Sequence, residues 1–455
     1  MNLGWQKIHM VGVGGAGMSA IARVLMEGGV EVSGSDARES AAFGSLRELG
    51  MTGRVGHKAE LAAGADVVIM SAAIPESNPE LEFAREHGIP ILLRGAALAR
   101  LVEKKRVLAI SGTHGKTTTS GMLASVLCRG GLDPTYLLGA DVAGLGAGGH
   151  LGEGEIAVVE ADEAYRSFLW LKPAVALVTN VDRDHLDHFG SMDALREAFG
   201  SFMSRAGEAV IACAESDEAM ALAAPFDPIT YGFDGRAAIR AERVRYTASG
   251  AGFDLIVEGD LKGFVSLEVT GRHNVLNALA AAAAALHVGL DAGAVCKGLA
   301  GFRGVSRRFE YRGQYNGANL VDDYAHHPAE IDATLTAARS GPWRRVLAVF
   351  QPHLYSRTQD LRDDFGIALG KADFIVVTDV YGAREEPVPG VTGKLVVEAV
   401  GEAVPGRRVA YLPKLSEAAR YLAGVVRPGD LVITLGAGDV TTLHDRLLGT
   451  PGEDA

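Results

Sequence analysis

The sequence contains little cysteine, and the few residues are scattered. Cys128, Cys213 and Cys296 are the three cysteines of the 455-residue chain, and no C-x-x-C pair occurs. This spacing supports neither a disulfide framework nor a zinc site, and it is typical of a protein in a reducing compartment. The N-terminal segment also lacks the apolar core and cleavage site of a signal peptide, so we expect a cytoplasmic protein.

Positive charge and long hydrophobic runs are scarce as well. The 44 Lys and Arg residues against 56 Asp and Glu give a net charge of −12, which argues against a nucleic-acid partner. The most apolar segment, residues 276–290, is shorter than the roughly 20 residues that span a bilayer, so we expect a buried helix and no stable membrane association. A hydrophobic share of 48% nevertheless allows sizeable cores and excludes a disordered chain.

The length of the chain corresponds to about three domains. Short β-branched runs alternate with amphipathic segments, which is typical of βαβ units and parallel sheets. We therefore predict an α/β protein with domains at residues 1–104, 105–308 and 309–455. A charged stretch marks the first predicted boundary, and a Gly- and Arg-rich stretch marks the second.

Glycine is abundant, with 58 residues, and two glycine-rich loops each stand between a predicted strand and a predicted helix. The first loop has the pattern G-x-G-x-x-G from Gly12 to Gly17, and Asp36 follows at the end of the next predicted strand. Such a loop lets the backbone approach a pyrophosphate at a helix N-terminus. Spacing alone leaves a nicotinamide cofactor, another nucleotide diphosphate and a structural turn open.

The second loop, residues 111–119, reads S-G-T-H-G-K-T-T-T. It is a variant of the G-x-x-x-x-G-K-[ST] phosphate-binding loop, because Ile110 occupies the place of the first glycine. Lys116 would reach the β- and γ-phosphates of ATP, and the Thr117 hydroxyl would meet Mg²⁺. The agreement of strand, motif and helix predicts ATP binding, with a simple turn as the alternative.

Acidic and imidazole side chains follow two later strands. Residues 160–163 read E-A-D-E, where a Mg²⁺ ligand is expected, although a solvated turn is an ordinary alternative. Residues 179–188 contain three Asp and two His, and zinc is the competing interpretation of that segment. The phosphate-binding loop upstream favours a site around ATP, and we interpret His188 as structural.

Four further polar motifs occur downstream. They are G-R-H-N-V-L-N from Gly271, R-R-F from Arg307, D-D-Y-A-H-H-P from Asp322 and Q-P-H-L-Y-S-R from Gln351. Each motif alone could be a helix cap or a turn. Their joint presence with the two glycine loops requires a common explanation.

In this order and spacing, the motifs resemble those of the Mur ligase family of peptidoglycan synthesis over almost the whole chain. The resemblance implies an N-terminal Rossmann-like domain for a UDP-sugar, a central P-loop ATPase domain with a parallel sheet, and a C-terminal Rossmann-like domain for an amino acid. It also replaces the nicotinamide interpretation of the first loop with a UDP diphosphate.

The reaction implied by the resemblance is the ATP- and Mg²⁺-dependent ligation of L-alanine to the lactyl carboxylate of UDP-N-acetylmuramate, by a monomer or homodimer. A recycling ligase that attaches an intact tripeptide to the same UDP-sugar is the nearest alternative. A P-loop switch protein would not require the first loop or the C-terminal motifs. A nicotinamide-linked dehydrogenase would leave the phosphate-binding loop unexplained.

The resemblance further implies roles for individual residues. The UDP-sugar would contact Gly12, Gly14, Gly15, Ala16, Gly17, Asp36, Ser71 and Asn78. ATP would contact Gly112, Thr113, His114, Gly115, Lys116, Thr117, Thr118, Asn274, Asn277, Arg308 and Asp323. Metal ligands would be Thr117, Glu160 and His185, and the amino acid would contact Tyr324, His353 and Arg357. Catalytic roles are implied for Lys116, His185, His326 and Arg357.

Two departures from the family pattern affect these assignments. Ala164, Tyr165 and Arg166 follow E-A-D-E where relatives often have S-D, so a sugar or phosphate contact there differs. Leu354 stands where many relatives have arginine, which leaves Arg357 as the expected partner of the amino-acid carboxylate. A lysine that could be carbamylated near the metals, as in other family members, is not identifiable.

Overall fold

The computed structural model describes residues 4–183, 189–247, 250–383 and 385–449. Contacts divide the chain into two compact units, and nearly all of the first two β-sheets fall in the first unit while the third sheet falls in the second. The first unit comprises Met1–Val244, Gly252–Leu267 and Asn274–Arg303, and the second comprises Arg245–Ala251, Glu268–His273 and Gly304–Ala455. No helix among the described residues is long and apolar enough to cross a membrane.

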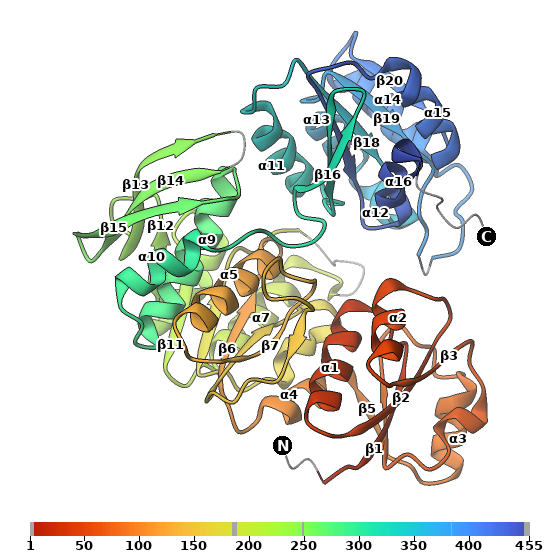
Figure 1. The fold of residues 1–455 in the computed structure, drawn as a ribbon, viewed down its shortest axis with the longest axis vertical. Coiled ribbons are helices and arrows are strands. Elements are labelled where there is room, and N and C mark those ends of the chain that lie inside the picture. The colour runs from red at the N-terminus through yellow and green to blue at the C-terminus, as the bar shows by residue number, and fades with distance from the viewer. Residues whose placement is uncertain (1–3, 184–188, 248–249, 384, 450–455) are drawn as a thin grey trace. The chain divides into compact units, whose positions relative to one another are not determined.

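The N-terminal sheet has five parallel strands in the order β3-β2-β1-β4-β5 (Figure 1). Its elements are β1 (Lys7–Val11), α1 (Ala16–Glu27), β2 (Glu31–Asp36), α2 (Ala41–Glu48), β3 (Thr52–Val55), η1 (Ala59–Ala62), β4 (Val67–Met70), α3 (Pro79–Glu86), β5 (Ile91–Leu93) and α4 (Arg94–Val102). Apolar residues of α1 and α2 cover one face, and those of α3 cover the other. The strand order reverses at β1, where open α/β sheets bind ligands.

The central sheet has ten strands in the order β15-β14-β13-β12-β11-β10-β6-β9-β7-β8. Its strands are β6 (Arg106–Ser111), β7 (Thr135–Leu137), β8 (Gly149–His150), β9 (Ile156–Glu160), β10 (Val175–Val178), β11 (Ala209–Cys213), β12 (Ile229–Gly232), β13 (Ile239–Tyr246), β14 (Ala251–Val257) and β15 (Asp260–Leu267). Its helices are α5 (Lys116–Arg129), η2 (Ala164–Trp170), α7 (Met192–Met203), α8 (Asp217–Ala223), η3 (Ala224–Phe226), α9 (Arg272–His287) and α10 (Ala292–Ala300). The strands from β7 to β13 in the sheet order pair in parallel, as predicted.

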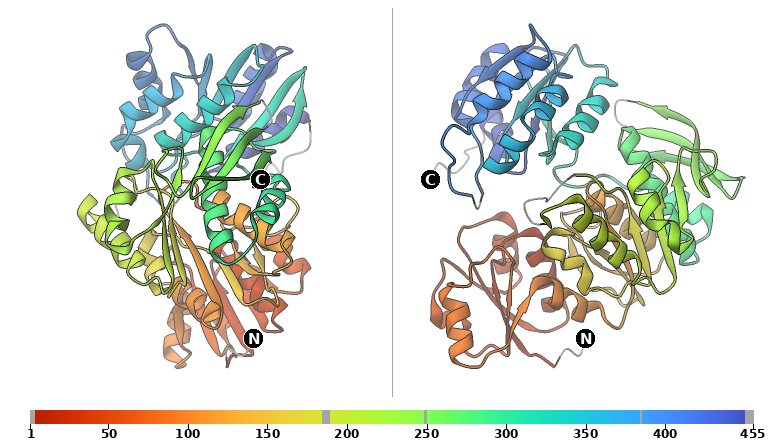
Figure 2. Two further views of the ribbon diagram at one scale, coloured as in Figure 1. Left: turned by 90° about the vertical axis from the view of Figure 1, so that its left-hand side faces the viewer. Right: turned by 180° about the vertical axis from the view of Figure 1, so that it is seen from behind.

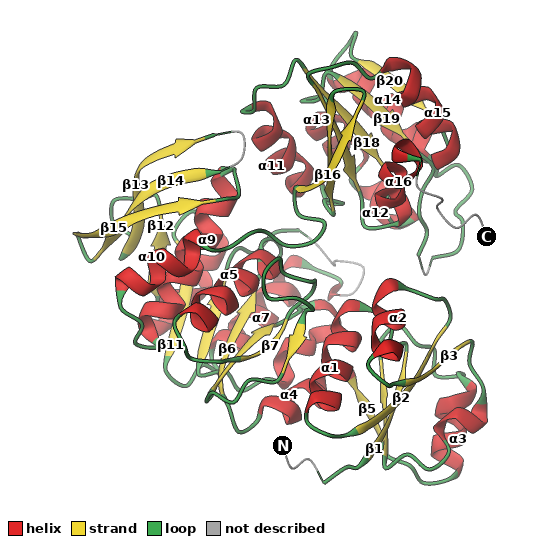
Figure 3. Cartoon of the chain, in the orientation of Figure 1, coloured by secondary structure: helices red, strands yellow, loops and turns green. Residues whose placement is uncertain are grey.

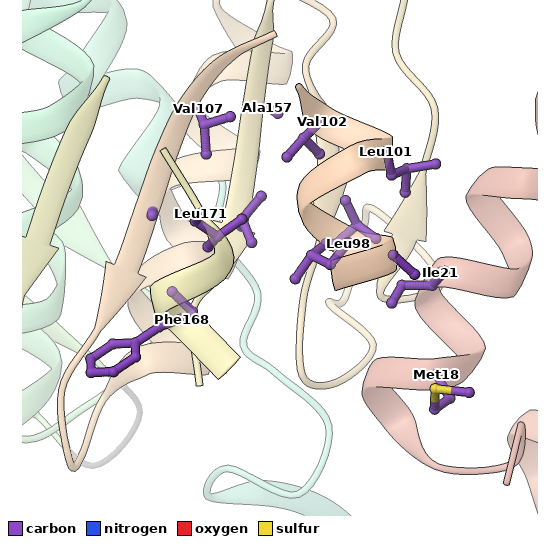
Figure 4. Packing of buried hydrophobic residues seen from close by; sticks show 14 of the residues in the cluster. Met18, Ile21, Leu98, Leu101, Val102, Val107, Ala157, Phe168 and Leu171 are labelled. Atoms are coloured by element: carbon purple, nitrogen blue, oxygen red, sulfur yellow. The ribbon is translucent and has the colours of Figure 1, made fainter. Parts of the chain in front are cut away.

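The first two sheets share one hydrophobic core. Figure 4 shows part of it, where Leu98 and Leu101 of α4 lie near Ile21 of α1, and Phe168 and Leu171 continue the cluster toward the central sheet. All of these side chains are buried. Because burial of apolar surface stabilises by about 25 cal/mol per Å², this continuous cluster holds the N-terminal sheet against the central one.

The third sheet has six strands in the order β16-β17-β21-β18-β19-β20, and β16 alone among them pairs antiparallel within the described chain. Its elements are β16 (Glu310–Tyr315), β17 (Ala318–Asp323), α11 (Pro328–Arg339), β18 (Arg345–Phe350), α12 (Tyr355–Asp360), α13 (Arg362–Leu369), β19 (Phe374–Val377), α14 (Gly393–Ala403), β20 (Arg408–Tyr411), α15 (Leu415–Val425), β21 (Asp430–Leu435), η4 (Asp439–Thr442) and α16 (Leu443–Leu448). Apolar residues of α11, α13 and α14 cover one face, and those of α15 and α16 cover the other. Figure 2 gives two further views of this sheet and its helices.

The predicted fold class is confirmed: three parallel-rich sheets, each with helices, make up the chain (Figure 3). The apolar segment 276–290 forms a helix as predicted as far as His287, within α9, and its residues 277–285 are buried. The domain boundaries at residues 104 and 308 stay predictions.

Candidate active site

The phosphate-binding loop connects β6 to α5 and is shaped by two glycines. Gly112 and Gly115 have φ of +131° and +83°, a region that side chains with a Cβ rarely adopt. A Cβ on Gly115 would lie 2.6 Å from Oδ1 of Asn277. Helix α5 has no acidic residue in its first turn, so its N-terminal N–H groups and dipole favour an anion there.

Lys116 lies at the start of α5 among carbonyl and carboxylate oxygens. Its Nζ donates to the carbonyl of Gly112 at 2.6 Å and to Oε1 of Glu163 at 2.9 Å. Burial alone would lower the pKa of Lys116, but the carboxylates at positions 160, 162 and 163 outweigh burial and raise it. The lysine is therefore cationic and held in the loop, as a phosphate-binding role requires.

Thr117 and Glu160 form the described part of the predicted Mg²⁺ site. The Thr117 hydroxyl donates to Oε1 of Glu160 at 3.0 Å, and the Gly139 amide donates to Oε2 at 2.7 Å. Burial raises the pKa of Glu160 in the absence of a cation. Hydroxyl and carboxylate oxygens are ligands that Mg²⁺ prefers, so these residues fit the ion. His185 and His188 lie outside the described residues.

The segment after β10 braces the phosphate-binding loop. Asn180 Oδ1 accepts the amide of His114 at 2.8 Å, and the Thr179 hydroxyl donates to the His114 carbonyl at 2.6 Å. The Thr113 hydroxyl accepts the amide of Asp182 at 2.9 Å. These bonds give the T-N-x-D part of the motif a supporting role that its sequence did not reveal. No cluster of three or more His, Cys, Asp or Glu side chains suited to a metal occurs among the described residues.

Two asparagines of α9 lie next to α5. Asn277 Oδ1 accepts the Thr119 hydroxyl at 3.2 Å, and its Nδ2 donates to Asn274 Oδ1 at 3.3 Å. Both asparagines are buried, as is Thr118 on α5. The structure thus brings them to the phosphate-binding loop, and their contact with adenine stays a prediction.

The first glycine loop connects β1 to α1. The amides of Gly12 and Val13 both donate to the carbonyl of Ser35, and Gly12 has φ of +78°. Helix α1 begins after Gly15, with no acidic residue in its first turn and no side-chain cap. Ala16 and Gly17 therefore open a helix whose N-terminus has the polarity that an anion requires.

The other predicted sugar-nucleotide residues surround this loop in different ways. Asp36 Oδ2 accepts the amide of Gly14 at 2.9 Å. A Cβ on Gly12 would lie 3.3 Å from Cβ of Ser71, so Ser71 borders the loop. Asn78 is buried and caps α3, where its Oδ1 accepts the amide of Glu80 at 2.9 Å. Their contacts with a ligand stay predictions.

A buried carboxylate lies beneath the first loop, and no sequence motif marks it. Glu80 is fully buried and accepts from His9 Nε2 at 2.7 Å, His57 Nδ1 at 2.9 Å and the Ser35 hydroxyl at 2.7 Å. Burial opposes its ionisation, but bonds from His9, Ser35 and His57 outweigh burial and lower the pKa of Glu80. The carbonyl of Ser35 also accepts the amides of Gly12 and Val13 in the glycine loop. The hydrogen bonds around Glu80 therefore hold in place the residue to which the loop is bonded.

In the second unit, Asp323 ends β17 and is held by backbone amides. Its two carboxylate oxygens accept the amides of Phe309 and Ala325, each at 2.8 Å. Burial raises the pKa of Asp323 to about 6, although Arg308 opposes this. Arg308 itself lies 3.4 Å from Glu330 and over the ring of Tyr324. The predicted reach of Arg308 and Asp323 to ATP stays a prediction.

The predicted amino-acid residues gather at the carboxyl ends of β17 and β18. The ring of His326 makes edge-to-face contacts with those of Tyr324, at 5.2 Å, and His353, at 5.5 Å. Arg357 Nη1 lies 3.4 Å from His353 Nδ1. Tyr381 stacks on His353 at 6.0 Å and was not found from the sequence, because nothing in its motif marks it. The residues proposed from two distant motifs thus share one cluster.

Both departures from the family pattern occur at unusual backbone positions. Tyr165 and Arg166 each have φ of +54°, and Leu354 has φ of +69°. Such conformations cost about 1–3 kcal/mol and persist where surrounding contacts impose them. The Leu354 side chain is buried, so this position adds apolar packing beside the cluster and no charge.

Comparison with known proteins covers nearly the whole chain. The description "Mur ligase family, catalytic domain" matches residues 7–106, "Mur ligase middle domain" matches 110–285, and "Mur ligase, glutamate ligase domain" matches 307–438. The UDP-N-acetylmuramate–L-alanine ligase of Renibacterium salmoninarum is 44% identical over 460 residues, which cover 98% of this chain and 97% of that protein.

Solved structures give the same result. The UDP-N-acetylmuramate-alanine ligase of Thermotoga maritima matches with a TM-score of 0.85 and 31% identity, covering 97% of this chain and 98% of that one. A murein peptide ligase from Psychrobacter arcticus matches with a TM-score of 0.74 and 25% identity, covering 99% of each chain.

Proposed function

Because this chain belongs to the Mur ligase family, we propose that it joins L-alanine to the lactyl carboxylate of UDP-N-acetylmuramate in peptidoglycan precursor synthesis, with ATP converted to ADP and phosphate. The observation that carries this proposal is the 44% identity to an L-alanine ligase across 98% of the chain, together with a phosphate-binding loop that holds a cationic Lys116. The reaction would take place in the cytoplasm.

In the first step, a lactyl carboxylate oxygen attacks the γ-phosphorus of ATP, the bond to the bridging oxygen breaks, and ADP leaves. Two anionic groups must approach each other, which is electrostatically unfavourable. Lys116 and the amides at the start of α5 offset this repulsion and hold the γ-phosphate in line. Mg²⁺, held by Thr117 and Glu160, would supply further charge neutralisation at the phosphates.

In the second step, the amine of L-alanine attacks the carbonyl carbon of the acyl phosphate, phosphate leaves, and the nitrogen loses a proton. His326 Nδ1 lies 3.0 Å from the Tyr324 carbonyl, which can only accept, so Nδ1 carries the hydrogen and Nε2 carries the lone pair. His353 Nδ1 accepts from Arg357, which puts the hydrogen of that ring on Nε2. We therefore assign proton acceptance to His326 and binding of the amino-acid carboxylate to Arg357.

The test is phosphate release by purified protein with Mg·ATP and UDP-N-acetylmuramate, compared for L-alanine, glycine, L-serine and the tripeptide L-Ala-γ-D-Glu-diaminopimelate. We expect L-alanine to drive release best, with the amide identified by mass. Release that depends on the tripeptide alone would assign the chain to recycling. Release that is independent of any added amine would contradict amide formation.

A further inference from the structure

Helix α4 begins with an arginine, Arg94, although a positive charge is unfavourable at a helix N-terminus. Arg94 is the first residue of α4, a helix that has no acidic residue in its first turn and no side-chain cap. The positive end of a helix dipole repels a guanidinium. Where a residue violates a local preference in this way, the cause lies in what its side chain does outside the helix.

The side chain of Arg94 lies against the first glycine loop. A Cβ on Gly17 would collide with Nη1 of Arg94, so glycine at this position leaves room for the guanidinium. Gly17 belongs to the first turn of α1, which also lacks acidic residues. The N-terminus of α1 and the Arg94 guanidinium therefore act on the same loop, and each favours an anion there.

On its other side, Arg94 contacts the acidic segment of the ATP site. Its Nη2 donates to Oδ2 of Asp162 at 3.0 Å. Asp162 directly precedes Glu163, whose Oε1 accepts from Nζ of Lys116 at 2.9 Å, and it follows Glu160 by two residues. The side chains are 24% and 34% exposed, so the pair is only partly screened by solvent.

Close packing fixes the position of Arg94 relative to Asp162. A Cβ on Gly95 would lie 2.9 Å from Cδ1 of Trp170 and 3.1 Å from Cβ of Ser167, in the segment that follows Asp162. Apolar residues of α4 and η2 belong to the same buried cluster. The start of α4 is thus packed against the acidic segment, and this packing holds Arg94 and Asp162 close to each other between the first two sheets.

We propose that Arg94 is a positioning residue that couples the two substrate sites, because it contacts the loop for the sugar-nucleotide diphosphate on one side and Asp162 on the other. This inference rests on the proposed function. A diphosphate at Gly17 neutralises part of the guanidinium charge. Asp162 then acts more strongly on Lys116 and on a cation at Glu160, so the sugar nucleotide increases the affinity for Mg²⁺-nucleotide. By linkage, Mg²⁺-nucleotide increases the affinity for the sugar nucleotide by the same factor.

The experiment measures the dissociation constant of a non-hydrolysable Mg·ATP analogue by titration calorimetry, with and without saturating UDP-N-acetylmuramate. For the wild-type chain we expect binding to tighten about fivefold or more. In Arg94→Met, which keeps the stem and removes the charge, this factor should fall to about one. In Asp162→Asn this factor should also fall to about one. The double variant should show the same factor as either single variant, because both substitutions break the same ion pair.

Two variants separate coupling from folding. Arg94→Lys keeps the charge without the planar fork and should retain part of the factor. Arg47→Met removes an exposed arginine of α2, which pairs with Glu39 beside the N-terminal sheet. It should leave the tightening of nucleotide binding by the sugar nucleotide unchanged. A factor that survives in Arg94→Met, or a wild-type factor of one in protein that forms the amide normally, would overturn the coupling. Wild-type protein that forms no amide would overturn the proposed function instead.

Discussion

The two glycine loops of the first unit have similar backbones but different side chains around them. Each follows a buried strand, each uses a glycine at positive φ, and each opens a helix without acidic residues in its first turn. Around the second loop, three carboxylates surround Lys116, whereas around the first loop Arg94 and Asp36 stand alongside the glycines. In both loops the backbone has the polarity that favours an anion, and the loops differ in the side chains that other elements bring to them.

The largest expected effect concerns the lysine that only the second loop contains. Lys116→Met should lower turnover by roughly 100- to 1000-fold or more, because a donor to the developing charge is lost. It should also reduce the free energy of unfolding by about 3–5 kcal/mol, because Glu163 is left buried without its cation. Phosphate release and denaturant unfolding measure the two effects.

Adding Glu163→Gln to Lys116→Met separates these two effects. The double variant should recover most of the stability and none of the activity. Recovery of turnover would refute the role of Lys116. Lys105→Met, which removes a lysine bonded to backbone carbonyls in the connection between β8 and β9, should reduce turnover little.

One glutamate lies near each loop, and replacing each by glutamine should change the free energy of unfolding in opposite directions. Glu80 has a lowered pKa, so it contributes stability above its unfolded pKa near 4.5 and loses it as the pH falls. Glu160 has a raised pKa, so its contribution is present at low pH and is lost as the pH rises above about 4.5. At pH 7, Glu80→Gln should destabilise by about 1–3 kcal/mol, and Glu160→Gln should stabilise the ligand-free protein.

Unfolding midpoints of both variants between pH 4 and 8 measure this difference. Glu160→Gln should also abolish the stabilisation that Mg²⁺ with an ATP analogue gives the wild type. If both variants shift the midpoint in the same direction at pH 7, the contrast between the two loops is wrong.

The smallest expected difference between the two loops concerns the glycines themselves. Gly12→Ala and Gly115→Ala should each cost about 1–2 kcal/mol, because both glycines have positive φ. Gly115→Ala should cost about 1 kcal/mol more, because the new Cβ meets Asn277, whose oxygen already accepts from Thr119. At Gly12 the neighbours are side-chain atoms of Ile74 and Ser71, which can shift.

Gly44→Ala is the matched control for this pair, since Gly44 lies inside α2 with no atom closer than 3.8 Å to the new Cβ. Alanine should raise stability there by about 0.5–1 kcal/mol. If Gly12→Ala and Gly115→Ala reduce the free energy of unfolding equally, the side chain of Asn277 moves away from the new Cβ at no greater cost than that of Ile74.

Local patterns were sufficient to predict the alternation of strands and helices and both loops, and the family resemblance added the pairing of Thr117 with Glu160. In each case the chemistry follows a strand end directly, so the residues lie at the same edge of a parallel sheet. The family resemblance implied a common site for Tyr324, His326, His353 and Arg357. The structure brings these residues together because their two motifs follow neighbouring strand ends.

The sequence by itself therefore determined where the two glycine loops stand between strand and helix, and which polar side chains follow the neighbouring strands. The tertiary structure decided which distant residues hold these loops in place. They are Asn180 at the second loop, Glu80 at the first, and Arg94 between the first loop and Asp162. Glu80 lies 71 residues from His9 along the chain, and Arg94 lies 68 from Asp162. No periodicity or spacing links residues so far apart, because their contact exists only once sheets and helices have packed around a common core.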